Sequence, residues 1–255
     1  MALDHLRRIV VEGPIGVGKT TLAQRLADHL RAATLFETPA ENPFLARFYA
    51  EPARYALPVQ LRFLLQRAER LATWHKATLT GERIVADSFL PRDRLFAQLT
   101  LPADELALYD AMAKALALPQ QRIDLVICLQ ARAEDLLPRI AKRAVPYETG
   151  IDADYLERIC AAYGELFLYY DAAPTLIVDT AAFDPVGNDD DFRAHQPREH
   201  AQRTTCSLSL PAWENERRTT LPGWKGKAAR RALRMFPWLV CAAHDVQPFP
   251  SSLGE

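Results

Sequence analysis

A glycine-rich stretch near the N-terminus has the residue types and spacing that bind phosphate: Gly13-Pro14-Ile15-Gly16-Val17-Gly18-Lys19-Thr20-Thr21. It contains the pattern G-x-x-x-x-G-K-[ST], in which backbone N–H groups and a helix N-terminus surround a polyphosphate. A β-branched run at 9–11 precedes it, and leucines at helical spacing over 21–31 follow it, which is the required strand–loop–helix context. We therefore predict a nucleoside triphosphate site, with Lys19 on the β- and γ-phosphates and the Thr20 hydroxyl on Mg²⁺.

Two carboxylates follow predicted strands beyond this loop. Glu37 comes after a short strand expected at 34–36, and Asp87 ends a buried strand expected at 83–87. The carboxyl ends of strands in an open α/β sheet line the ligand crevice, so both acids are well placed for chemistry. Asp87 stands where nucleotide-binding folds have an acid that interacts with Mg²⁺. We therefore expect Asp87 to contribute to both the metal site and the substrate site. Glu37 is explained equally well as a solvated acid at a strand end.

Two polar residues share one face of a long helical pattern over 58–78. Gln60 and Arg67 lie seven residues apart, which is two helical turns. Aligned polar residues in an otherwise apolar helix indicate a polar pocket. An exposed polar stripe has the same spacing, so both interpretations stay open.

Three cations share a face of the helix expected after Glu134. Arg139, Lys142 and Arg143 are separated by offsets of three and four, which places them on the same side. A solvated basic face has this pattern. In a fold that transfers phosphate, the same pattern indicates a lid whose cations clamp the phosphoryl group.

Five short apolar runs alternate with the helical patterns and position these residues. The runs lie at 9–11, 34–36, 83–87, 124–129 and 175–179. Such alternation predicts a three-layer α/β domain with a parallel five-stranded sheet. Asp104 is a candidate N-cap for a helix through Leu116, and Asp152 for a helix to about Tyr170.

The C-terminal part of the chain has a different character. After about Arg193, tryptophan, proline and arginine are scattered without a helical or strand period, apart from a weak basic helix near 225–236. We expect a domain at 1–193 and an irregular tail at 194–255 that carries no catalytic residue and packs little against the sheet.

The composition of the 255-residue chain limits its class. Its net charge of −1 argues against a nucleic-acid or membrane partner, and no apolar run approaches the roughly 18 residues of a membrane helix. The four cysteines form no C-x-x-C pair, so neither a zinc site nor a disulfide framework is indicated. The N-terminus leaves no room for a signal peptide before the first strand. We expect a cytoplasmic protein.

The order of these motifs over residues 7–192 resembles the deoxynucleoside kinase family, in particular its bacterial deoxyguanosine/deoxyadenosine kinase branch. The resemblance implies a P-loop kinase fold with a helical lid. It implies that Glu37 is the general base on the sugar 5′-hydroxyl and that Arg139 and Arg143 are lid arginines. It also implies that the loop containing Asp191 and Phe192 covers the adenine of ATP.

The same resemblance assigns the substrate residues. Asn42-Pro43-Phe44-Leu45, followed by Phe48 and Tyr49, is similar to a segment that closes over the nucleoside, and Tyr49 would hydrogen-bond the 3′-hydroxyl. Gln60 would bind the base edge, and Arg67 with Asp93 would complete a purine pocket. Glu148 would contact the 3′-hydroxyl from the lid.

The implied reaction converts ATP and a deoxynucleoside to the 5′-monophosphate and ADP, with Mg²⁺ as cofactor; relatives are commonly homodimers. Two other classes share the phosphate loop. A thymidylate-type nucleoside-monophosphate kinase would need extra cations for its acceptor phosphate, and a P-loop regulator would bind ATP and form no product.

This chain departs from the family pattern at two positions. The family has acid–Arg–Ser after its third strand, whereas this chain has Asp87-Ser88-Phe89. The resemblance implies that the missing arginine stabilises the general base and the phosphates. Either Arg92 or Arg94 reaches back to replace it, or the lid arginines supply this stabilisation. Val145 stands where many relatives have a further lid arginine.

Overall fold

The computed structural model describes residues 6–87 and 89–181, and a parallel five-stranded sheet lies at its centre. The strands follow the order β2-β3-β1-β4-β5, and all four neighbouring pairs are parallel. The bounds are β1 Arg8–Glu12, β2 Ala33–Leu35, β3 Ile84–Ala86, β4 Leu125–Gln130 and β5 Thr175–Asp179. The predicted α/β class and the five strands are therefore confirmed.

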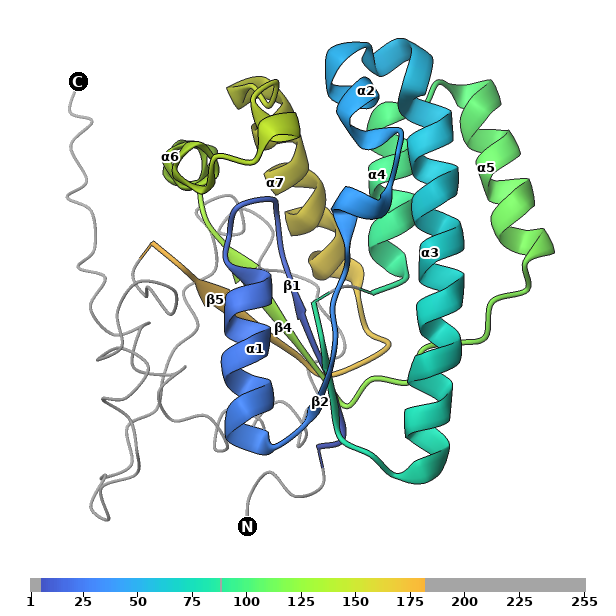
Figure 1. The fold of residues 1–255 in the computed structure, drawn as a ribbon, viewed down its shortest axis with the longest axis vertical. Coiled ribbons are helices and arrows are strands. Elements are labelled where there is room, and N and C mark those ends of the chain that lie inside the picture. Colours follow the sequence, from blue (N-terminus) through green and yellow to red (C-terminus); the bar gives the residue numbers. More distant parts are fainter. Residues whose placement is uncertain (1–5, 88, 182–255) are drawn as a thin grey trace, which may run out of the picture.

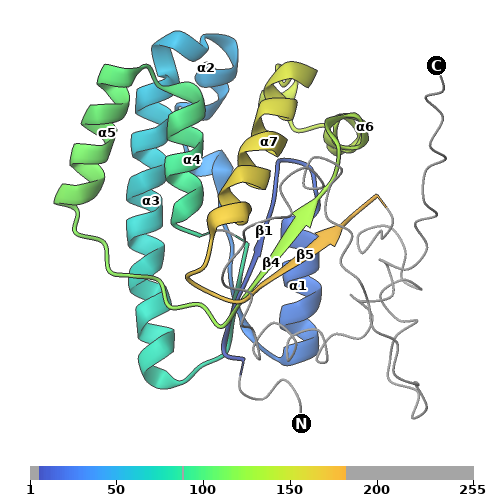
Figure 2. The same cartoon turned by 180° about the vertical axis from the view of Figure 1, so that it is seen from behind.

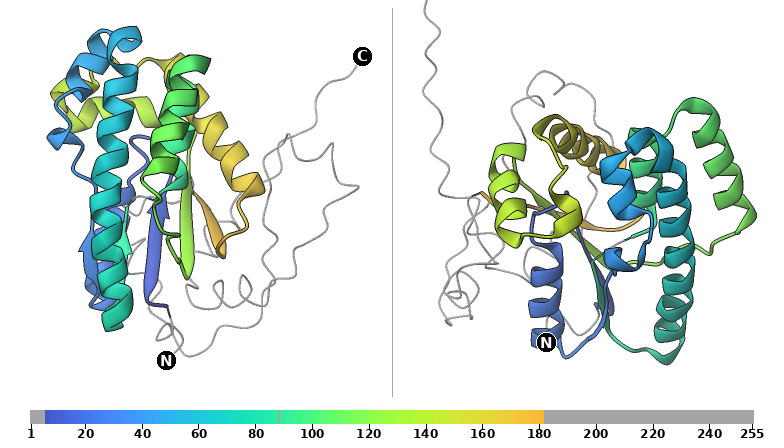
Figure 3. Two further views of the ribbon diagram at one scale, coloured as in Figure 1. Left: turned by 90° about the vertical axis from the view of Figure 1, so that its right-hand side faces the viewer. Right: turned by 45° about the horizontal axis from the view of Figure 1, so that its top comes forward.

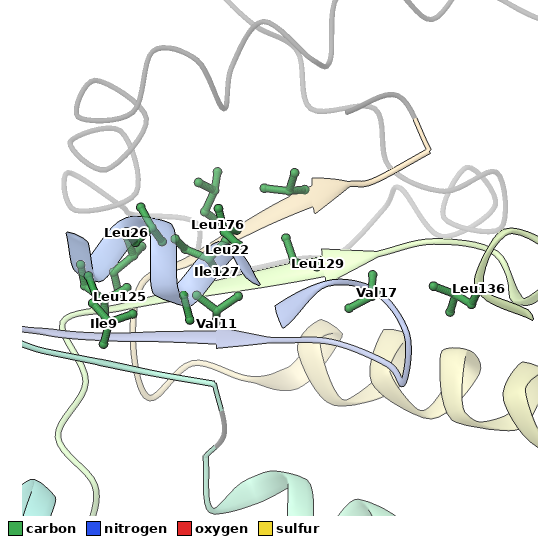
Figure 4. Close-up of a cluster of buried hydrophobic side chains, with 14 of the residues drawn as sticks. Ile9, Val11, Val17, Leu22, Leu26, Leu125, Ile127, Leu129, Leu136 and Leu176 are labelled. Carbon is green, nitrogen blue, oxygen red and sulfur yellow. The ribbon is translucent and has the colours of Figure 1, made fainter. Parts of the chain in front are cut away.

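Alternate residues of β1 face opposite sides of the sheet, which creates the layers. Ile9 and Val11 pack with Leu22 and Leu26 of α1 (Lys19–Leu30), as Figure 4 shows. Val10 faces a second cluster, built with α3 (Pro52–Thr80), α4 (Pro91–Thr100) and α7 (Ala153–Tyr169). Figures 1 and 2 show α1 on one face of the sheet and these helices on the other. This arrangement is the expected three-layer architecture.

A third apolar cluster joins helices beside the sheet. α2 (Leu45–Ala50), α3, α4 and α5 (Ala103–Ala115) contribute to it, and Tyr109 of α5 is 2% exposed. Asn42 links the entry of α2 to α3, because its side-chain amide donates to the Val59 carbonyl at 3.0 Å. Figure 3 shows α5 at the outer edge of this group.

A helical lid covers the phosphate loop. It consists of α6 (Ala133–Arg143) and the 3₁₀ turn η2 (Pro146–Glu148); another 3₁₀ turn, η1 (Pro39–Glu41), precedes α2. A Cβ atom added at Gly16, where φ is +81°, would lie 2.6 Å from Cγ1 of Ile140. Gly16 is therefore needed both for its backbone conformation and for the close approach of α6.

Several predicted boundaries are wrong. The helix expected at 58 begins at Pro52 and contains Pro58, and buried neighbours such as Ala56 and Val59 offset the local cost of that internal proline. Pro102, not Asp104, flanks the start of α5. Asp152 does cap α7, since its carboxylate accepts the Tyr155 N–H at 2.7 Å.

The described residues contain no helix that is both long and apolar enough to cross a membrane. Residues 182–255 lie outside the described part of the chain, so the expectations for the tail, Asp191 and Phe192 stay predictions.

Candidate active site

A cavity of about 730 Å³ opens at the carboxyl ends of the strands, between the phosphate loop, the lid and helices α2, α3 and α4. It brings together most of the residues singled out in the sequence: Ile15, Gly16, Val17, Gly18, Lys19, Thr20, Thr21, Glu37, Tyr49, Gln60, Arg67, Asp87, Asp93, Arg139, Arg143 and Glu148. Gly13 and Pro14 do not line it. A Cβ atom on Gly13 would lie 2.3 Å from the Leu129 carbonyl oxygen, so the start of the loop packs against β4.

Lys19 and the first turn of α1 make one end of the cavity an anion site. Gly18, with φ 99°, turns the chain into α1, whose first N–H groups have no partner within the helix. The Lys19 ammonium donates to the carbonyls of Gly13 at 2.8 Å and Pro14 at 2.9 Å. Burial, and then the charge of Arg92, lower the pKa of Lys19 to about 8. Lys19 is thus a cation in a confined site suited to phosphate.

Thr20 and Asp87 form a set of oxygen donors beside this anion site. The Thr20 hydroxyl donates to Oδ2 of Asp87 at 2.6 Å, and Oδ1 of Asp87 accepts the Glu37 N–H at 2.8 Å. Mg²⁺ prefers oxygen ligands and is usually held by one or two protein groups together with substrate phosphates and water. The two side chains therefore fit Mg²⁺ bound with a nucleotide.

Glu37 lies between two guanidinium groups. Oε1 contacts Nη2 of Arg67 at 2.5 Å, and Oε2 contacts Nη2 of Arg92. Burial acts to raise the pKa of Glu37, but the charges of Arg92 and Arg67 outweigh burial and lower the pKa to about 2. Glu37 is therefore ionised at neutral pH and has both oxygens held, which excludes the alternative of a solvated strand-end acid.

Gln60, Arg67 and Asp93 form the polar wall at the other end. The Thr100 hydroxyl donates to the Phe96 carbonyl at 2.7 Å, so it can only accept from the Gln60 amide, at 3.1 Å. This contact fixes which way the amide points and leaves its oxygen and one N–H for a ligand.

Arg67 and Asp93 pair as expected, with Nη2 2.7 Å from Oδ1. Burial raises the pKa of Asp93 to about 6, against the opposing charge of Arg67. Within the described part of the chain, Oδ2 of Asp93 and Nε of Arg67 are buried without a hydrogen-bond partner. The pair therefore keeps one acceptor and one donor that its own contacts leave unused. The alternative of an exposed stripe is wrong, because Gln60 is 4% and Arg67 5% exposed.

The lid cations have different partners. Arg139 donates to the hydroxyl and the carbonyl of Thr180, both at 2.9 Å, and Arg143 donates to the Glu148 carboxylate at 2.6 and 2.7 Å. Lys142, on the same helix, also lines the cavity.

The tip of the lid contacts the closing segment of α2. The rings of Tyr49 and Tyr147 stack with centroids 6.5 Å apart. A Cβ atom on Gly150 would lie 3.2 Å from the Tyr49 carbonyl oxygen. The segment containing Tyr49 and the lid containing Glu148 therefore meet over the cavity.

Arg92 and Arg94 were the two arginines that could replace the one missing at position 88, and the structure shows which of them reaches Glu37. Arg92 is buried and contacts both Glu37 and Glu12. Arg94 points outward and pairs with Asp110, at 3.1 Å and with a side chain that is 56% exposed. Spacing along the chain could not separate these residues, because both follow the same strand.

Glu12 is a site residue that the sequence interpretation missed. Its carboxylate is fully buried beside the phosphate loop, where it accepts the Gly13 N–H at 3.0 Å and the Tyr163 hydroxyl at 2.9 Å. Glu12 ends β1 as Glu37 and Asp87 follow their own strands. The strand-end argument that found those two acids would also have found Glu12.

These features define a class of protein. A strand leads through a glycine-rich loop to a helix that begins with a lysine, and a Thr–Asp oxygen pair lies beside them. A cationic helix covers the cavity. This is the arrangement of a P-loop phosphotransferase, in which catalysis depends on positioning and on charge stabilisation.

A comparison with known families identifies the branch of that class. The model of the family described as "Deoxynucleoside kinase" matches residues 9–195, so the chain belongs to the deoxynucleoside kinase family. The expected family resemblance is thereby confirmed.

Curated relatives come from the same family. Deoxyguanosine kinase from Bacillus subtilis (strain 168) is 31% identical over 156 residues, which are 61% of this chain and 75% of that protein. Deoxyguanosine kinase from Lactobacillus acidophilus (strain ATCC 700396 / NCK56 / N2 / NCFM) is 29% identical over 197 residues, with 72% and 85% covered. The structure of deoxyadenosine kinase from M. mycoides with bound dATP superposes with a TM-score of 0.61 at 24% identity, over 68% of this chain and 91% of that one. This last likeness supports the fold.

Proposed function

We propose that this enzyme transfers the γ-phosphoryl group of ATP to the 5′-hydroxyl of a purine deoxynucleoside. One observation carries the proposal: Glu37, with both oxygens held, lies between the phosphate end of the cavity and the polar wall formed by Gln60, Arg67 and Asp93. A substrate hydroxyl placed at Glu37 would face the phosphate end of the cavity. The rest of the substrate would then contact the polar wall.

Glu37 orients the 5′-hydroxyl and takes its proton during transfer. A carboxylate with a pKa near 2 is a weak base, so its main contribution is to align the attacking oxygen. The transition state for phosphoryl transfer is loose, and the proton leaves the hydroxyl as the new P–O bond forms. Thr20 and Asp87 would hold Mg²⁺, which neutralises charge on the phosphate oxygens when bound.

The cations of the cavity stabilise the charge that develops on the phosphoryl group. Lys19 donates to the β- and γ-phosphates in place of the loop carbonyls. Arg139 and Arg143 do so from the lid after leaving Thr180 and Glu148. Phosphate oxygens are stronger acceptors for a guanidinium than the neutral oxygens of Thr180, and they replace the Glu148 carboxylate with an acceptor of the same kind. The loop containing Asp191 and Phe192, outside the described residues, would cover the adenine of ATP.

The sugar and base are selected by separate residues. Tyr49 and Glu148, which approach from α2 and the lid, bind the 3′-hydroxyl. The Gln60 amide offers a donor and an acceptor to the base edge, and the unused donor of Arg67 and acceptor of Asp93 complete a purine pocket.

A phosphorylation panel tests the function. The four deoxynucleosides and their 5′-monophosphates are each incubated with Mg-ATP, and products are separated by chromatography. We expect 5′-monophosphates from deoxyguanosine or deoxyadenosine and none from Lys19→Met enzyme. Products from the monophosphates alone would favour a thymidylate-type kinase, and ATP binding without any product would favour a P-loop regulator.

We further propose that the enzyme is a cytoplasmic homodimer without a nucleic-acid partner. Leu108 and Met112 of α5 and Leu116, which follows its last residue, recur every four residues and have 50%, 41% and 39% of their surface accessible. Light scattering should give twice the monomer mass for the full chain and the monomer mass for Met112→Lys. Leu79→Lys, at an 88% exposed site on α3, is the control.

A further inference from the structure

We infer that Arg92 is a positioning residue for Glu37 and that Glu12 is the anchor that holds Arg92 for this role. The inference rests on the proposed function, because it assumes that Glu37 orients the attacking hydroxyl. It concerns how the chain fixes that carboxylate.

Arg92 bridges the ends of two strands. Its Nη2 contacts Oε2 of Glu37, after β2, and its Nη1 lies 3.3 Å from Oε1 of Glu12, at the end of β1. Nη1 also donates to the Asp87 carbonyl at 3.5 Å. The side chain is 7% exposed, so these contacts are shielded from water. Arg92 thereby ties the catalytic carboxylate to the strand that leads into the phosphate loop.

Glu12 is a fixed anchor because each of its oxygens is held independently of Arg92. Oε2 accepts the Gly13 N–H at 3.0 Å and the Tyr163 hydroxyl at 2.9 Å, and Oε1 accepts the Phe89 N–H at 3.2 Å. These donors come from the phosphate loop, from α7 and from the segment before α4. A carboxylate held from three directions has one position, and its contact with Arg92 fixes the position of that guanidinium group.

Two arginines divide the control of Glu37. Arg67 holds Oε1 and Arg92 holds Oε2, so the carboxylate cannot rotate about its terminal bond. Arg67 also binds Asp93 in the base pocket, whereas the other carboxylate partner of Arg92 is Glu12, next to the phosphate loop. Loss of Arg92 should therefore slow the chemical step for every base, and loss of Arg67 should also change how bases are distinguished.

The buried position of Arg92 has a cost that a purely structural residue need not meet. Burying ion pairs is often no better for stability than packing apolar side chains of similar volume, while removing one partner costs about 3–5 kcal/mol. Arg94, on the same helix, makes an exposed ion pair of the kind worth about 0–1 kcal/mol. Arg94 is thus a matched control with the same charge and a different position.

The test compares steady-state kinetics of the full chain with Arg92→Met and Arg94→Met. A displaced catalytic group costs about a hundredfold in rate, so we expect Arg92→Met to lower kcat by at least that factor for both purine deoxynucleosides. The KM for ATP should stay within about threefold, an allowance well inside the tenfold that corresponds to 1.4 kcal/mol. Arg94→Met should retain the kcat of the unaltered enzyme.

A double variant separates positioning from folding. Arg92→Met leaves the Glu12 charge buried without its cation, so thermal melting of the single variant should fall. Glu12→Gln/Arg92→Met removes that charge, and we expect it to recover much of the melting temperature while kcat stays low. A double variant with restored kcat, or a loss confined to the KM for ATP, would overturn the inference.

The unaltered chain is assayed alongside. Absence of product from it would overturn the proposed function and this inference with it. Equal kcat values for the unaltered, Arg92→Met and Arg94→Met enzymes would overturn the inference alone.

Discussion

The two sides of the cavity use charge in different ways. On one side is the carboxylate cluster of Glu12, Glu37, Arg67, Arg92 and Asp93, whose side chains are at most 11% exposed and share partners. On the other side is the lid, where Arg143, 47% exposed, pairs with Glu148, which is 11% exposed. The cluster has one arrangement, because moving any member leaves a buried charge without its partner. The guanidinium of Arg143 is exposed, so it can exchange Glu148 for phosphate at small cost.

The largest effect should follow from removing the charge at the centre of the cluster. Glu37→Gln keeps the shape of the side chain but replaces one of the two arginine-bound oxygens with an N–H₂ donor and cannot deprotonate the hydroxyl, so we expect kcat to fall about 10²–10⁴-fold. ATP affinity, measured by calorimetry, should stay nearly unchanged because Lys19 and the loop are intact. A variant with the rate of the unaltered enzyme would end the assignment of Glu37 as the catalytic carboxylate.

Asp93→Ala should damage both folding and binding. It removes one partner of the buried pair with Arg67, a change that costs about 3–5 kcal/mol. Chemical denaturation measures the loss, and Asp93→Asn, which keeps the volume and one acceptor, should lose less. Equal stability of the alanine variant and the unaltered chain would show that the pair does not hold the pocket together.

Two of the three acids of the cluster, Glu37 and Asp93, should give opposite pH dependences of stability. The pKa of Glu37 falls from 4.5 to about 2 on folding, so its contribution is present above pH 4.5 and is lost as pH falls toward 2. The pKa of Asp93 rises from 3.8 to about 6, so the folded state binds the extra proton and stability falls as pH rises between these values. Burial also raises the pKa of Glu12, so Asp93→Asn should make the second decline smaller and leave the part that comes from Glu12. A decline of unchanged size in melting curves of Asp93→Asn would contradict the assignment.

Breaking the lid pair should separate activity from stability. Arg143→Gln is expected to lower kcat, because one arginine fewer faces the phosphoryl group, while the free energy of unfolding changes by less than about 1 kcal/mol. Arg132→Gln is the control, since Arg132 forms an exposed pair with Asp135 at the other end of α6. A stability loss as large as that of Asp93→Ala would mean that the lid is as fixed as the cluster.

The smallest effect is expected from the tail. We predict that truncation after Arg193 leaves kcat and melting temperature close to those of the full chain, because the described residues up to position 181 already form a five-stranded sheet and line the cavity. A collapse of either quantity would show that the C-terminal residues complete the fold.

The sequence predicts elements well where a local signal and a general rule coincide. The strand-end rule placed Glu37 and Asp87 at one edge of the sheet, and the structure joins them through the Glu37 N–H. The paired spacing of Gln60 and Arg67 predicted a shared face, and burial selected the pocket over the exposed stripe.

Contacts between distant segments could not be predicted in this way. The spacing of Arg92 and Arg94 gives no reason to bury one and expose the other, because α5 and β1 decide that through Asp110 and Glu12. Likewise, Thr180 holds Arg139 from 41 residues away. Position 88 lacks the arginine of the family pattern, and an arginine that contacts Glu37, Arg92, comes instead from the first turn of α4.

Arg67 places a constraint on how this enzyme can diverge. A single nitrogen, Nη2, contacts both Glu37 and Asp93, which the proposed function assigns to the reacting end and the base end. A mutation at residue 67 that improves the binding of a different base also removes the contact that holds the Glu37 carboxylate. We therefore expect such mutants to have a lower kcat. Lineages that change substrate are therefore expected to do so through Gln60 and Thr100, whose contact does not include Glu37.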